Sequence, residues 1–121
     1  MIGGIVKYLC CVYLKPDAYK DLSADDMAKL NRASVAYNDE LARKGRYIAA
    51  SALQAPSTAK TIRHSAGKPV VTDGPFAETK EVLGGFILVE ARDMKEAIRI
   101  AENIPVAQFG TIEVRPELKI D

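Results

Sequence analysis

The hydrophobic positions along the chain divide it into six strand-like segments and two helix-like segments. Strands are predicted where β-branched and other apolar residues run together or alternate, and helices where apolar residues recur every three or four positions. The predicted strands are 5–14, 47–53, 58–64, 69–72, 82–91 and 111–115, and the predicted helices are 24–44 and 94–104.

The ends of the two helices carry recognisable signals. Ser23 followed by Asp26 has the pattern of a capping box, and Gly45 suits the left-handed residue that ends a helix. Asp93 resembles a second cap, and Pro105 forbids the second helix from continuing. Core-facing positions of the first helix are predicted at Met27, Leu30, Ser34, Tyr37 and Leu41.

The order of these segments predicts an α+β fold. The segments 58–64 and 69–72 flank Ser65-Ala66-Gly67-Lys68 and read as a β-hairpin with a four-residue connection. Without this inserted hairpin the order is βαββαβ, which is the ferredoxin-like arrangement. At 121 residues the chain has the usual size of one domain, so we expect a single domain over 1–121.

The strands 5–14 and 82–91 are apolar on both of their faces. Two helices cover only one face of a four-stranded sheet, so the other face needs a partner from outside the chain. A second copy is the economical partner because most soluble oligomers are symmetric homodimers. The sequence therefore predicts a homodimer, although it does not say which residues of each strand face the partner.

Composition and charge exclude several classes of partner. Seventeen Lys and Arg residues against sixteen Asp and Glu residues leave a net charge of +1, which disfavours nucleic acid. No stretch approaches the apolar length of a membrane span. Cys10 and Cys11 are adjacent and are expected to be buried, reduced thiols. These observations predict a cytoplasmic protein without a membrane or nucleic-acid partner.

No catalytic or cofactor motif is present. The chain lacks a phosphate-binding loop, a dinucleotide fingerprint and a nucleophile elbow. One His with two adjacent Cys cannot build an ordinary tetrahedral zinc site without carboxylate help. We therefore predict no cofactor and no metal.

The segment Asp73–Glu81 places unusual polarity between two apolar strands. Its simplest interpretation is a turn, in which Asp73 accepts backbone hydrogen bonds, Gly74 and Pro75 set the backbone, and Phe76 plugs the edge of the core. The alternative is a binding loop in which Asp73 faces a cleft and Phe76 contacts a ligand.

Several strings support a resemblance to a known family. DGPFAETKE occupies positions 73–81. The others are Lys7-Tyr8-Leu9, Tyr37-Asn38, Leu53-Gln54-Ala55-Pro56, Leu83-Gly84-Gly85-Phe86 and Gly110-Thr111-Ile112-Glu113-Val114-Arg115-Pro116. Together they span almost the whole chain, which resembles the DGPF group of the YCII-related family.

This resemblance implies a dimeric α/β barrel with a ferredoxin-like fold, in which two sheets face each other. Relatives in the broader family are associated with a His and Asp pair in a cleft, which suits proton transfer on small oxygenated substrates. The DGPF group is also similar to modules found beside or fused to extracytoplasmic-function sigma factors, which implies a regulatory role instead.

The chain departs from the enzymatic relatives because its first helix contains no His. The single His64 lies at the end of a predicted hairpin strand and is a weaker catalytic candidate than Asp73. A solvated turn residue is the alternative reading of His64, since acid–base catalysis needs a fixed partner.

Three further residues are candidates for binding a ligand. Glu113 and Arg115 share one face of the last strand, where they form either an ion pair or, through Arg115, a guanidinium site for a substrate carboxylate. Tyr8 could offer a phenol donor, although Tyr in a strand more often packs in the core.

Two hypotheses of function remain open at this point. The first is a small-molecule-binding protein or acid–base enzyme with a pocket at the loop 73–81. The second is a non-enzymatic interaction or regulatory module linked to sigma-factor control of transcription. A closed pocket containing Asp73 would favour the first, and an exposed apolar face without a pocket would favour the second.

Overall fold

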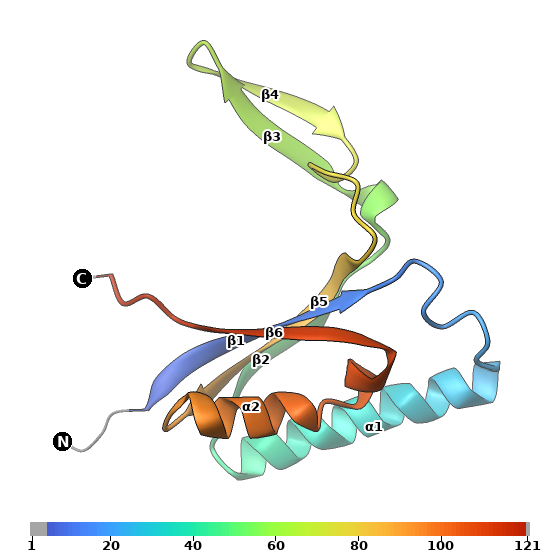
Figure 1. The fold of residues 1–121 in the computed structure, drawn as a ribbon, viewed down its shortest axis with the longest axis vertical. Helices are drawn as coiled ribbons and strands as arrows, with labels where there is room; N and C mark the ends of the chain where they lie inside the picture. The colour runs from blue at the N-terminus through green and yellow to red at the C-terminus, as the bar shows by residue number, and fades with distance from the viewer. Residues whose placement is uncertain (1–4, 121) are drawn as a thin grey trace.

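The computed structural model describes residues 5–120 and is an α+β structure with two helices and a mostly antiparallel sheet (Figure 1). The elements in chain order are β1 (Val6–Leu14), α1 (Ala24–Arg43), β2 (Tyr47–Ala52), η1 (Pro56–Thr58), β3 (Lys60–Ser65), β4 (Lys68–Asp73), β5 (Val82–Ala91), α2 (Met94–Glu102), η2 (Pro105–Phe109) and β6 (Gly110–Pro116).

Four strands form the main sheet in the order β2-β5-β1-β6, and every neighbouring pair is antiparallel. This arrangement confirms the predicted α+β class and is compatible with a ferredoxin-like fold. β6 is an edge strand of this sheet. Pro116 lies at its end, where a residue without a backbone N–H disturbs the sheet least.

The predicted helix caps are confirmed. The Ser23 side chain accepts from the backbone N–H of Asp26, and the Asp26 side chain accepts in return from Ser23. Gly45 takes a positive φ of 70° directly after α1. Asp93 caps α2 by accepting from the backbone N–H of Glu96. Neither helix within residues 5–120 has the length and apolarity that a membrane crossing requires.

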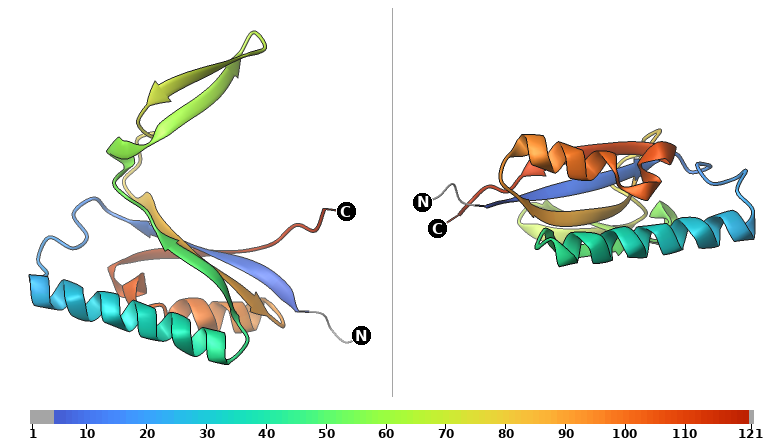
Figure 2. Two further views of the ribbon diagram at one scale, coloured as in Figure 1. Left: turned by 180° about the vertical axis from the view of Figure 1, so that it is seen from behind. Right: turned by 90° about the horizontal axis from the view of Figure 1, so that it is seen from below.

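Both helices pack on the same face of the sheet, as the sequence predicts (Figure 2). The core combines buried side chains of β1 and β5 with Leu41 of α1 and three residues of α2. Its buried members are Tyr8, Cys10, Leu41, Ile87, Val89, Ala91, Ala97, Ile100, Ala101 and Ile104. The two interior strands therefore supply the centre of the core.

The opposite face of the sheet, which we call the open face, carries apolar side chains that neither helix covers. Register places Leu9, Cys11 and Tyr13 of β1 on this face, with Leu83, Phe86 and Leu88 of β5 beside them. Leu9 and Leu83 are exposed, and Cys11 is partly buried. The expectation that both cysteines are buried is therefore wrong for Cys11, because adjacent strand residues point to opposite faces and only Cys10 reaches the core.

β3 and β4 pair only with each other and form a ribbon that projects from the main sheet (Figure 1). We call this ribbon, residues 60–73, the arm. Ile62 and Val71 are directly opposite each other in it and are 63% and 61% exposed. The arm thus presents apolar side chains to solvent.

Two details of the arm differ from the prediction. Its first strand begins at Lys60 rather than residue 58, because Pro56–Thr58 form a 3₁₀ turn that the fixed φ of Pro56 favours. Its connection has two residues rather than four, since Ser65 still pairs with Lys68. Ala66 and Gly67 both take positive φ, at 49° and 78°, which matches the right-handed twist of a hairpin.

Candidate functional site

A cleft of about 750 Å³ lies between α1 and the sheet, and it exists because small residues meet there. β2 contributes Ala50 and Ala52, and β5 contributes Gly85, to the wall on the sheet side. A Cβ atom on Gly85 would approach the carbonyl oxygen of Ser51 to 2.7 Å, so no side chain is accommodated at that position. On the helix side the polar residues Asn31, Ser34 and Asn38 lie beside the apolar Met27, Leu30 and Val35.

The rim of the cleft is largely apolar. Leu14, Pro16 and Tyr19 close one end, and the Tyr19 ring packs edge-on against Phe109 with centroids 5.5 Å apart. Val35 of α1 and Leu53 after β2 are exposed side chains on the lining. The cleft therefore has the apolar character of small-molecule sites.

Asn38 is the polar group that stands out inside the cleft. Its Oδ1 atom is buried, and no donor within residues 5–120 forms a hydrogen bond with it. Buried polar side-chain atoms almost always have a partner, because an unmade hydrogen bond costs free energy. Because the surrounding protein atoms enclose this oxygen, it does not face the open space of the cleft.

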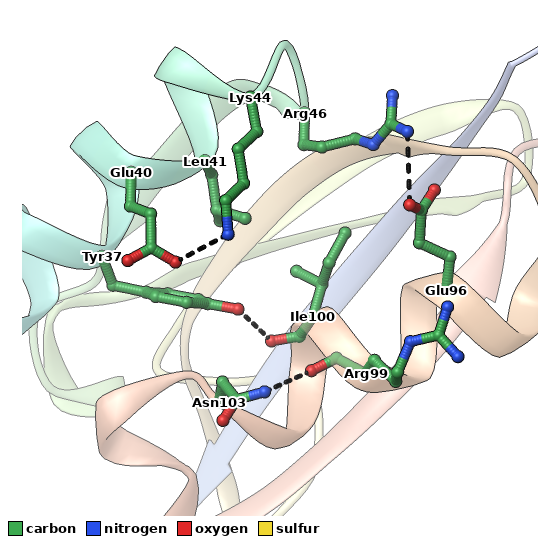
Figure 3. Close-up of a pocket in the computed structure, with 9 residues that line it drawn as sticks. All are labelled: Tyr37, Glu40, Leu41, Lys44, Arg46, Glu96, Arg99, Ile100 and Asn103. Carbon is green, nitrogen blue, oxygen red and sulfur yellow. Dashed lines mark hydrogen bonds and ion pairs between the residues drawn. The ribbon is translucent and has the colours of Figure 1, made fainter.

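A second hollow, of about 740 Å³, lies between the C-terminal part of α1 and α2 (Figure 3). Tyr37 Oη donates across it to the carbonyl oxygen of Ile100 at 2.7 Å. Burial, with smaller effects from Glu40 and Cys10, raises the pKa of Tyr37 to about 12. The phenol therefore stays neutral and acts as a bridge between the helices.

The charged groups of this second hollow are largely paired with one another (Figure 3). Lys44 pairs with Glu40 at 3.1 Å, and Arg46 pairs with Glu96 at 3.2 Å. The backbone N–H of Arg92 donates to Glu96 and, with Arg46, holds the pKa of that carboxyl below its ordinary value. The Arg46–Glu96 pair ties the segment after α1 to α2, and the pairing of these charges leaves the apolar cleft as the better candidate for a ligand.

The structure places three of the sequence-predicted site residues on the arm and the loop that follows it. The Asp73 side chain is 87% exposed and forms an ion pair with Lys60. His64 is exposed near the tip of the arm, opposite Pro69. Phe76 is 75% exposed, and its carbonyl oxygen accepts from Arg63. None of the three lines the cleft within the described chain.

The other three predicted residues lie on β1 and β6. Tyr8 is 5% exposed and belongs to the core, in agreement with its packing interpretation. Glu113 and Arg115 form an ion pair of 3.0 Å on the open face, and hydrogen bonding with Glu113 raises the pKa of the Arg115 guanidinium. Within one chain, therefore, Arg115 pairs with Glu113 while Asp73 pairs with Lys60 on the arm.

Sequence reasoning did not select Asn38 as a site residue. The signal that could have found it is the spacing Met27, Asn31, Ser34, Asn38 and Leu41, which alternates four and three. Residues at that spacing share one face of a helix, and here the middle three are polar. A polar interruption of a core-facing stripe is the mark of a helix that does not pack fully against its sheet.

No metal site is formed by the residues that the structure describes. Within 5–120, no three His, Cys, Asp or Glu side chains come together as ligands. The Asp, Glu and His residues also stay out of the cleft lining.

Comparison with known proteins identifies the family. The model of the YCII-related domain matches residues 6–120. A stretch of 64 residues is 50% identical to an uncharacterised protein of Rhizobium meliloti (strain 1021), and it covers 50% of this chain. The match spans 52%, about half, of the length of that relative. Since the domain model accounts for nearly the whole chain, this protein belongs to the YCII-related domain family.

Proposed function

We propose that this protein binds a small, largely apolar molecule in the cleft between α1 and the sheet. The observation that carries the proposal is the cleft itself, whose volume of about 750 Å³ falls within the size of sites that hold small ligands. Ala50, Ala52 and Gly85 on the sheet side carry too little side chain to fill the space below α1.

The lining favours binding over acid–base catalysis. Proton transfer needs a titratable group within hydrogen-bond reach of the substrate. Lys15, Tyr19 and Tyr47 are the titratable residues of the lining, and no carboxylate or imidazole of the described chain joins them. The cleft thus offers apolar contact and amide or hydroxyl hydrogen bonds.

A pair of neighbouring substitutions on α1 tests the proposal. Ser34→Leu fills the cleft from the helix side, whereas Ala33→Leu adds the same side chain at an exposed position outside the lining. Titration with 2-naphthol, followed by its fluorescence, should show binding to the native protein and to Ala33→Leu. Ser34→Leu should weaken binding at least tenfold.

The same experiment can refute the proposal that the cleft is the binding site. Equal affinity of the two variants would show that the probe binds elsewhere, for example on the open face. Absence of binding up to the solubility of the probe would argue against a small-molecule site of this kind.

We also propose that the open face pairs with a second copy of the chain. The support is the exposure of Leu9 and Leu83 on a sheet face that neither helix covers. Exposed contiguous apolar surface of this sort is typical of interfaces. Pairing of two such faces would form the dimeric barrel that the resemblance implies.

A further inference from the structure

We infer that the arm packs on a second copy of the chain, through the face of the ribbon that carries Ile62 and Val71. The inference rests on the pairing of open faces proposed above and specifies a second contact between the same two copies. Its basis is a ribbon that projects away from the main sheet and exposes apolar side chains (Figure 1).

The register of β3 and β4 divides the side chains of the arm into two faces. One, which we call the apolar face of the arm, consists of Lys60, Ile62, His64, Pro69, Val71 and Asp73. Ile62 and Val71 lie opposite each other at its centre, the Lys60–Asp73 ion pair lies at its root, and His64 lies near its tip. An apolar centre with a polar rim is typical of protein–protein interfaces.

The other face of the arm is more polar, and the chain's own loop contacts it. This face consists of Thr61, Arg63, Ser65, Lys68, Val70 and Thr72. Thr61 Oγ1 donates to the carbonyl oxygen of Gly74 at 2.8 Å, and Arg63 donates to the carbonyl oxygen of Phe76 at 3.1 Å. The loop after β4 is thus held to the polar face, whereas Ile62 and Val71 on the apolar face remain exposed.

The arm lacks the support that a two-stranded ribbon needs. Such a ribbon is marginally stable at best in water unless a further strand or a packed surface supports it. Within residues 5–120, β3 and β4 make their main contacts with each other. Contact of Ile62 and Val71 with another molecule would supply the burial that the chain itself does not provide.

The position of the arm favours a second copy as that molecule. The loop that follows β4 leads into β5, where Leu83 is one of the exposed apolar residues of the open face (Figure 1). A copy that pairs with the open face at this end of the sheet therefore lies near the root of the arm. Leu9 and Leu83 are 37% and 41% exposed, less than Ile62 and Val71. A dimer that covered the open face alone would leave the more exposed pair in water.

Charge and symmetry favour contact of the arm with the body of the second copy rather than with its arm. The arm contains Lys60, Arg63 and Lys68 against Asp73, so it is basic, whereas the whole chain has a net charge of only +1. The rest of the chain is therefore slightly acidic, and two arms placed together would repel each other. A two-fold axis lets each chain place its arm on the other, which closes the dimer and leaves neither arm free for a third chain.

Substitutions on the two faces of the arm test the inference. Ile62→Lys places a charge at the centre of the apolar face. Thr72→Lys adds the same side chain to the polar face, at a residue that is also exposed, and serves as the matched control. In sedimentation equilibrium, Ile62→Lys should raise the dissociation constant of the dimer at least tenfold, and Thr72→Lys should leave it nearly unchanged.

Hydrogen exchange of the native protein gives a second measurement that needs no variant. Backbone amides of β3 and β4 should exchange more slowly at protein concentrations above the dissociation constant of the dimer than below it, because the second copy would hold the ribbon in place.

The outcomes distinguish the arm contact from the pairing of open faces. An unchanged dissociation constant in Ile62→Lys, an equal rise in Ile62→Lys and Thr72→Lys, or arm amides that exchange equally fast at both concentrations overturns the arm contact. Disruption of the dimer by Leu9→Asp, a change on the open face, would still support the pairing of open faces in each of these cases. A native protein that stays monomeric overturns both, and binding of 2-naphthol in the cleft is measured independently of either.

Discussion

Tyr37 Oη donates a hydrogen bond of 2.7 Å to the carbonyl oxygen of Ile100 and so joins α1 to α2 (Figure 3). Asn38 is the next residue of α1. The contact that ties the helix to its neighbour therefore also fixes the turn of α1 that carries Asn38, a residue of the cleft lining.

We expect Tyr37→Phe to lower the free energy of unfolding by about 1 kcal/mol, the usual net value of one hydrogen bond. The loss stays modest because the Ile100 oxygen also accepts from the backbone N–H of Asn103 at 3.2 Å. Urea denaturation measures the change. Tyr19→Phe is the matched control, since its ring keeps the packing against Phe109, and an equal loss in both variants would contradict the prediction.

The same variant has a pH signature. Burial raises the pKa of Tyr37 from 10 to about 12, so folding favours the neutral phenol. Its contribution to stability is complete below pH 10 and is lost as the pH rises to about 12. Over that range Tyr37→Phe should lose less stability than the native protein.

Gly85→Ala should destabilise the protein more than Gly84→Ala. A Cβ on Gly85 would meet backbone of β2, with Ser51 O at 2.7 Å and Ala52 Cα at 3.3 Å. At Gly84 the close neighbour is the end of the flexible Leu14 side chain, at 2.8 Å. We expect about 1–3 kcal/mol for the first change and less for the second, measured by denaturant midpoint. A larger loss of stability for Gly84→Ala would mean that the backbone of β2 shifts to make room more easily than the Leu14 side chain does.

The two thiols should react differently with 5,5′-dithiobis(2-nitrobenzoic acid). Burial, with a smaller effect from Cys11, raises the pKa of Cys10 to about 11, and the side chain is fully buried. Cys10 alone, in Cys11→Ala, should therefore react only when the protein unfolds. Cys11 alone, in Cys10→Ala, should react more slowly as protein concentration rises, because a second copy would cover the open face. Fast reaction of Cys10 in the folded protein would contradict this assignment.

A charge on the open face should disrupt the homodimer. Leu9→Asp places a carboxylate among exposed apolar side chains of that face. We expect unfolded or aggregated chain rather than a stable monomer, because subunit association contributes to folding stability. Sedimentation and circular dichroism measure the outcome, with Ala33→Asp on the exposed side of α1 as control. A native chain that sediments as a folded monomer at micromolar concentration would rule out the dimer.

Asp73 and the cleft lead to different forecasts for ligand binding. The loop interpretation expects Asp73→Asn to weaken binding by removing the charge, with His64→Ala as the control. If the ligand binds in the cleft, both variants should bind 2-naphthol as the native protein does, since neither residue lines the cleft. The exposed pair with Lys60 limits the stability change of Asp73→Asn to about 1 kcal/mol at most. Loss of binding in Asp73→Asn would show that the ligand binds at the loop 73–81 instead.

The sequence alone determined the type and order of the two helices and six strands. Ser23, Gly45, Asp93 and Pro105 are local signals whose effects depend on a few neighbouring residues, and each has the predicted role. The apolar runs of β1 and β5 also predicted a sheet with one face left uncovered. Such patterns can be recognised in the sequence because the backbone itself sets how often side chains return to the same face of a strand or helix.

Only the tertiary structure decided where the space in the molecule lies. The cleft is lined by Ser34 of α1, Ala50 and Ala52 of β2 and Gly85 of β5, among others, which are far apart in the chain and meet only when α1 packs on β2 and β5. Likewise, the prediction could name Asp73 but not its exposed partner Lys60 on the arm, whereas the Glu113–Arg115 ion pair was one of the two interpretations that the sequence allowed. The volume of a cavity and the pairing of hydrogen-bonding groups depend on several segments packed together, so the pattern of one segment cannot predict them.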